Sequence, residues 1–131
     1  MNRIELHQAL DRLLDRLEAI ESTARALVGE YNQMFPHARL CLYLVRDRDS
    51  GHVYGPYWGR LRKITKGGQK RNVKDYIGTR LVRRDMYRNG LVNLRRELRT
   101  FDQRARKLRK ERNRSGGRLR RLRRILQGSR E

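Results

Sequence analysis

Arginine and lysine side chains are concentrated in residues 104–124, which read RARKLRKERNRSGGRLRRLRR. Twelve of these positions are Lys or Arg, and Glu111 is the only acid. Guanidinium groups bind phosphate oxygens through paired hydrogen bonds and stack on bases. Burying so many cations would cost more free energy than the few leucines return. The segment therefore predicts a surface for a polyanion, with these candidate nucleic-acid contacts: Arg104, Arg106, Lys107, Arg109, Lys110, Arg112, Arg114, Arg118, Arg120, Arg121, Arg123 and Arg124.

Net charge rises along the chain, which has 131 residues and a formal charge of +20. Residues 1–38 carry −2, residues 39–82 carry +8 and residues 83–131 carry +14. The last segment has seventeen Arg and only two Lys, a bias that mere solubility does not require. A membrane surface is the other common polyanion, but the tail lacks the Trp or Phe that an interfacial helix inserts. Nucleic acid is the favoured partner.

Composition also limits other chemistry. Cys41 is the only cysteine, so the chain has no internal disulfide and no cysteine cluster for zinc. The three histidines are scattered without ligand spacing, and we expect neither a metal nor a cofactor. No stretch approaches the roughly 18–20 apolar residues of a membrane span, and the first residues do not resemble a signal peptide. We expect a cytoplasmic protein, nucleoid-associated if its ligand is DNA.

Two helices and a small sheet are expected to position the basic residues. Residues 4–32 predict a helix that ends near Gly29, Asn32 and Pro36. Its apolar seam has steps of three and four, the pattern of a core helix or of a coiled coil with another copy or a helical partner; packing within the chain is favoured. The seam consists of Leu6, Leu10, Leu13, Leu17, Ile20, Ala24, Leu27 and Tyr31.

Residues 39–46, 53–65 and 70–78 are rich in β-forming residues and predict a three-stranded antiparallel meander. Gly67 and Gly68 supply the positive φ of a tight hairpin turn. Strand alternation lets one face pack on the helices through Leu61, Val73 and Ile77. The other face would then present Trp58, Arg60, Arg62 and lysines to solvent. The sequence does not determine the register between the strands.

Residues 82–112 predict a second helix, antiparallel to the first, and we expect Ser115, Gly116 and Gly117 to break it. Beyond the break, the basic tail is a kinked continuation, a short helix, or a segment that orders only on a polyanion. The expected fold is α+β, with a long helix, a three-stranded antiparallel sheet, a second long helix and a basic tail. The expected division is a helix–sheet–helix domain, residues 1–112, and a tail, residues 113–131.

The GPYW turn and the hairpin that closes on YIG, Gly55 to Gly78, resemble the three-stranded arm-type DNA-binding domains of phage integrases. They also resemble small bacterial and archaeal mobile-element proteins with a PYW–YIG hairpin. The resemblance implies a sheet that lies in the DNA major groove, with these contacts: Trp58, Arg60, Arg62, Lys70 and Lys74. The alternative is that Tyr57, Trp58 and Tyr76 are core and half-buried aromatics.

Tyr76, Ile77 and Gly78 also resemble half of the signature of GIY-YIG nucleases. Tyr54 lies too far upstream to complete the signature. Glu97 is flanked by arginines, so an ion pair accounts for it without a catalytic role. We therefore expect no enzyme. The predicted function is an accessory or regulatory DNA-binding protein of a mobile element, non-enzymatic and self-associating through the helical seams. An RNA-binding component of a ribonucleoprotein and a helical scaffold for a partner protein remain alternatives.

Overall fold

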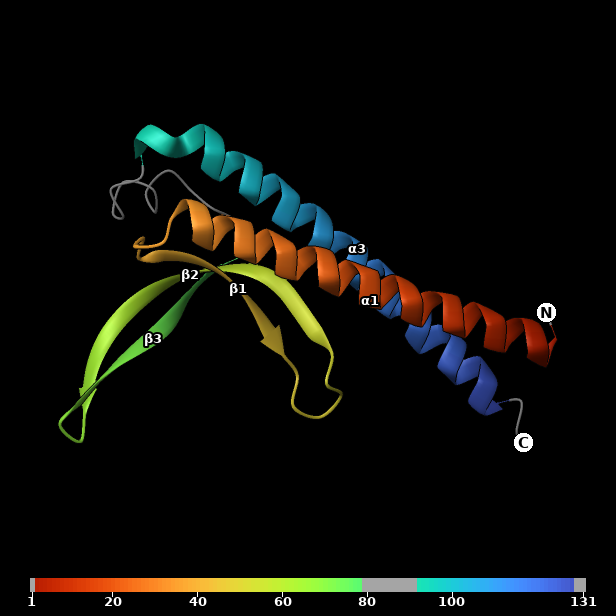
Figure 1. The fold of residues 1–131 in the computed structure, drawn as a ribbon. Helices are drawn as coiled ribbons and strands as arrows, with labels where there is room; N and C mark the ends of the chain where they lie inside the picture. Colours follow the sequence, from red (N-terminus) through yellow and green to blue (C-terminus); the bar gives the residue numbers. More distant parts are fainter. Residues whose placement is uncertain (1, 79–91, 129–131) are drawn as a thin grey trace.

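The computed structural model describes residues 2–78 and 92–128, and the expected order of helix, three-stranded sheet and helix is confirmed. The elements are α1 (Arg3–Met34), β1 (Leu40–Arg46), β2 (Val53–Lys66), β3 (Gln69–Gly78), a short 3-10 helix η1 (Val92–Leu94) and α3 (Arg95–Gly128). Residues 82–91 of the expected second helix lie outside the described residues. Figure 1 shows α1 and α3 side by side and antiparallel, with one half of the pair over the sheet and the other half projecting beyond it.

The first helix forms where the heptad pattern predicts it. Asn2 and Glu5 form a reciprocal capping box, which satisfies backbone N–H groups at the start of α1. The helix continues past Gly29 and ends at Met34, two residues before Pro36. The seam packs against α3 of the same chain, as the favoured interpretation predicts, through these buried residues: Leu6, Leu17, Ile20, Ala24, Leu27 and Tyr31.

The sheet is the predicted antiparallel meander, with strand order β1-β2-β3. Lys66 pairs with Gln69, and the two glycines between them have φ of +60° and +77°, so the predicted two-residue turn is confirmed. The β2–β3 hairpin reaches away from the helices, as Figure 1 shows. The long hairpin is therefore an arm, and only the end of the sheet near the helices contributes to the core.

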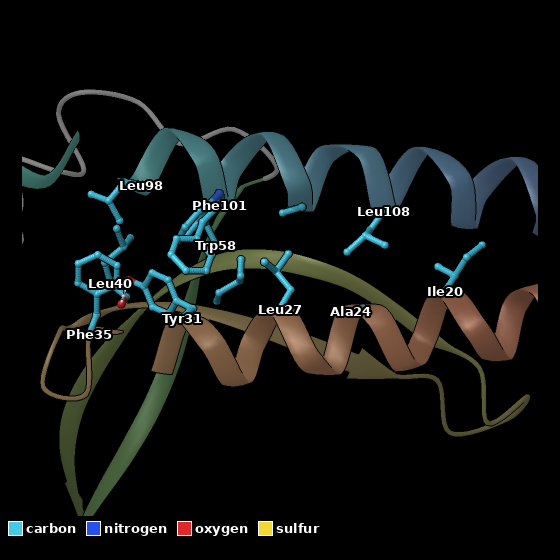
Figure 2. Close-up of a cluster of buried hydrophobic side chains, with 12 residues drawn as sticks. Ile20, Ala24, Leu27, Tyr31, Phe35, Leu40, Trp58, Leu98, Phe101 and Leu108 are labelled. Carbon is cyan, nitrogen blue, oxygen red and sulfur yellow. Dashed lines mark hydrogen bonds between the residues drawn. The ribbon is translucent and has the colours of Figure 1, made fainter. Parts of the chain in front are cut away.

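An aromatic cluster joins the two helices to the sheet (Figure 2). Tyr31 of α1 contacts Trp58 and Phe101, with ring centroids 5.5 and 5.4 Å apart and near-perpendicular planes. The Tyr31 hydroxyl donates a 2.6 Å hydrogen bond to the Leu40 carbonyl, which pins the end of α1 to β1. Edge-to-face packing of this kind adds to the hydrophobic stabilisation and fixes the relative positions of α1, β2 and α3.

Trp58 lies at the centre of this cluster and is 0% exposed, so its prediction as an exposed nucleic-acid contact is wrong. Trp58 pairs with Leu42, and both side chains are buried. The face expected to be solvent-exposed is therefore the one that packs on the helices at this end of the sheet. Of the residues expected to do so, Ile77 contacts the core, whereas Leu61 pairs with Lys74 on the opposite face.

The predicted break at residues 115–117 is also wrong, because α3 continues through them to Gly128. Ser115 and Gly116 are buried, and the apolar seam resumes beyond them with Leu119 and Leu126. Glycine in a helix costs about 1 kcal/mol against alanine, and packing of the seam on α1 offsets that cost. The expected boundary between residues 112 and 113 falls inside this helix.

Candidate nucleic-acid interface

The exposed surface of α3 is dominated by cations. Arg104 pairs with Glu30 at 2.7 Å, and Arg106 pairs with Asp102 at 2.9 Å. Among the residues that the structure describes, the other exposed cations of α3 have no carboxylate partner. These cations are Arg95, Arg96, Arg99, Lys107, Lys110, Arg114, Arg118, Arg120, Arg121, Arg123 and Arg124.

Two of the predicted contacts, Arg109 and Arg112, are instead buried against the sheet. Arg109 Nη1 donates a 2.7 Å hydrogen bond to the Pro56 carbonyl, and Arg112 Nε donates one of 3.1 Å to the Val53 carbonyl. The expectation that these two arginines are exposed is therefore wrong, and their guanidinium groups bond to the protein backbone. Burial lowers the pKa of the Arg109 guanidinium, which still remains charged at neutral pH.

The strand pairing explains why these arginines are needed. Pairing of β2 with the described part of β3 ends at Trp58, opposite Gly78. Among the described strands, the earlier part of β2 pairs with β1 alone, and the two guanidinium groups bond to carbonyls there. The Arg112 guanidinium also lies 4.4 Å from the centre of the Tyr54 ring, a cation–π contact. Arg109 and Arg112 thus close this edge of β2.

The β2–β3 hairpin carries the other predicted contacts, and all four of its cations are exposed: Arg60, Arg62, Lys70 and Lys74. Arg62 pairs with Asp75 through its Nε at 2.9 Å, so one of the four is partly neutralised. Arg60 and Arg62 line a hollow of about 720 Å³ together with Arg39 and Lys63. A twisted two-stranded ribbon of this kind has the dimensions that the major groove of B-DNA admits.

A second basic hollow, about 860 Å³ in volume, lies between β2 and α3. Gly55 and Tyr57 form its sheet side, and α3 contributes Arg106, Lys107, Arg109, Lys110, Arg112 and Asn113. This hollow connects the basic side of α3 to an aromatic side chain of the sheet. It therefore brings cationic side chains and an aromatic ring together in one site.

No protein-family model, curated protein or solved structure matches the chain. The assignment of a function therefore depends on the residues of the site itself. In the described ranges, no three metal-ligating side chains come together, and neither long helix is apolar enough to cross a membrane. Cys41 is buried, and that burial raises the pKa of its thiol, which disfavours the thiolate that a reactive cysteine needs.

The sequence prediction missed the tyrosines on the outer face of the sheet. Tyr43 and Tyr57 are cross-strand partners with ring centroids 6.3 Å apart, and Tyr76 lies 5.9 Å from Tyr57. Trp58 is buried and Tyr57 half-buried, as the alternative of core and half-buried aromatics expects, but Tyr76 is 61% exposed and does not fit it. The sequence indicated this face only indirectly, through the alternation of Tyr57 and Trp58 along β2.

Proposed function

We propose that this protein is a non-enzymatic nucleic-acid-binding protein and that DNA is its favoured ligand. The observation that carries the proposal is the exposed row of α3 cations without carboxylate partners among the described residues. A cationic surface that serves only solubility usually mixes charges of both signs. On this helix the acids are few, and Asp102 already binds Trp58 and Arg106.

The length of α3 supports contact with several phosphates at once. A helix of 34 residues is about 50 Å long at 1.5 Å per residue. About 15 base pairs of duplex cover the same distance at 3.4 Å per step. Multiple phosphate contacts predict strong binding at low salt and a steep loss of affinity as salt rises.

The β2–β3 hairpin supports DNA over double-stranded RNA. A two-stranded ribbon fits the major groove of B-DNA, whereas the major groove of A-form RNA is too deep and narrow for side chains to read. Exposed Arg60, Lys70 and Lys74 would provide phosphate or base contacts from this ribbon. The accessory role in a mobile element and the self-association through the helices remain predictions from the sequence.

The test is a salt titration of duplex DNA binding by fluorescence anisotropy. The variant Lys110→Gln/Arg114→Gln/Arg121→Gln removes three exposed cations of α3. The control, Arg3→Gln/Arg25→Gln/Arg48→Gln, removes the same charge from other exposed positions. We expect the α3 variant to reduce the slope of log K against log salt by about 0.9 for each lost phosphate contact. An equal reduction of this slope in both variants, or no DNA binding by the unaltered protein, would contradict the proposal.

A further inference from the structure

The outer face of the sheet carries three tyrosines in one contiguous cluster: Tyr43 of β1, Tyr57 of β2 and Tyr76 of β3. The rings of Tyr57 and Tyr76 meet edge to face at 78°. The opposite face at this level holds Leu42 and Trp58, which fill the core. The tyrosine cluster therefore adds no burial to the main core, and another reason for its position is needed.

A glycine at the centre of this face makes room for one of the rings. Gly59 lies between Cys41 and Tyr76 in the strand pairing. A Cβ atom at position 59 would come within 2.7 Å of Cε1 of Tyr43 and 3.1 Å of the Asp75 carbonyl oxygen. The Tyr43 ring thus lies across bare backbone, close to the sheet surface, and any side chain at position 59 would displace it.

Positive charge surrounds the cluster. Lys74 Nζ lies 5.4 Å from the centre of the Tyr43 ring. Tyr57 lines the hollow that also contains Arg106, Lys107 and Lys110 of α3. The carboxylate of Asp75 pairs with Arg62 on the opposite face of the sheet. A ligand on this face would therefore meet aromatic rings flanked by cations, which is complementary to flat rings joined by phosphates.

We propose that this outer sheet face binds unpaired nucleotides, with a base stacked on Tyr76 and the neighbouring phosphates held by Lys74 and the α3 cations. Tyr76 is the most exposed of the three rings described, and the Tyr57 ring supports it from the side. Stacking on a tyrosine requires a base that has left its duplex, because paired bases already stack on each other. The inference rests on the proposed nucleic-acid binding and extends it to a single-stranded segment.

The test compares a single-stranded DNA 12-mer, the same sequence as RNA and a 20-base-pair duplex, all at one salt concentration. Tyr76→Ala should weaken binding of the single strands about ten-fold, which is within the range for loss of one base–aromatic stack. Tyr76→Phe is the matched control, because it keeps the ring and should retain the affinity. Duplex affinity should be unchanged in both variants. Trp58 fluorescence confirms that each variant is folded, because this buried indole is the only Trp of the chain.

The outcomes separate this inference from the proposed function. Failure of the unaltered protein to bind any of the three ligands would overturn both. Binding of duplex and single strand that Tyr76→Ala leaves unchanged would overturn the inference and leave the proposed function standing. An equal loss for duplex and single strand would also overturn it, since the face would then contact only the backbone that both ligands share. A larger loss of affinity for RNA than for single-stranded DNA would support the inference and identify RNA as the preferred single strand.

Discussion

The indole N–H of Trp58 donates a 2.8 Å hydrogen bond to Oδ1 of Asp102, and the other carboxylate oxygen accepts from Arg106. This pair joins the middle strand of the sheet to the first half of α3, in a place where both partners are buried. A buried carboxylate is stable only when its charge is hydrogen-bonded. Trp58 and Asp102 therefore fix the position of α3 on the sheet, and with it the direction in which the basic side of the helix faces.

Removal of the Asp102 carboxylate should destabilise the fold strongly. Asp102→Ala leaves the indole N–H without its acceptor and removes the negative charge beside Arg106 and Arg109, so we expect a loss of about 2–4 kcal/mol in the free energy of unfolding. Urea denaturation followed by Trp58 fluorescence measures this loss. Glu97→Ala, which removes an exposed acid from the same helix, should change stability by less than about 0.5 kcal/mol. Similar stability of the two variants would show that the buried pair contributes little.

The arginines of α3 should separate into two classes. Arg112→Ala leaves the buried Val53 carbonyl without its donor and removes the contact with Tyr54, so it should destabilise by about 1–3 kcal/mol. Arg114→Ala changes an exposed residue and should leave stability unchanged while it weakens DNA binding. Chemical denaturation and anisotropy titrations of the two variants test the separation. Equal stability of both variants would contradict the structural role of Arg112.

Two adjacent glycines of α3 should respond in opposite directions to alanine. Gly117→Ala places a methyl group in open space, with Arg120 Nη2 at 3.9 Å as the nearest atom, and should stabilise the protein by about 1 kcal/mol through helix propensity. At Gly116 the new Cβ would lie 2.5 Å from Nη1 of Arg112. Gly116→Ala should displace that guanidinium from the Val53 carbonyl and lower stability. Thermal unfolding of both variants measures the difference, and higher stability of both variants would refute the prediction.

Local patterns predicted the elements of this fold well. The seam of residues 4–32 and the Gly67–Gly68 turn depend on neighbours in sequence, and both are confirmed. The break at Ser115–Gly117 was wrong because propensity is local, whereas the buried seam of the helix pair is not. The spacing already indicated a continuous helix, because steps of three and four lead from Leu108 through Arg112 and Ser115 to Leu119.

The candidate site was harder to predict, because strand alternation separates two faces without telling which one is covered. Trp58, Arg60 and Arg62 share a face, yet Trp58 is buried and the two arginines are exposed, since the hairpin extends beyond the helices. In α3, cations are so frequent that the sequence alone did not show that Arg109 and Arg112 face inward. Only their place relative to Ala105 and Leu108 distinguishes Arg109 and Arg112 from the exposed cations around them.

The ion pair between Glu30 and Arg104 predicts a pH dependence of stability. The hydrogen bond from Arg104 lowers the pKa of Glu30 below its ordinary value in the folded state. A lowered pKa contributes stability that is present above the unfolded-state pKa and is lost as pH falls through the folded-state pKa. Glu30→Gln should therefore be slightly less stable than the unaltered protein at pH 7, and the difference should disappear as the pH falls through the lowered pKa of Glu30. Unfolding of Glu18→Gln provides the control, because Glu18 is an exposed acid of α1 without an ion pair to the described residues. A loss of stability of the same size in Glu18→Gln would assign the effect to net charge rather than to the ion pair.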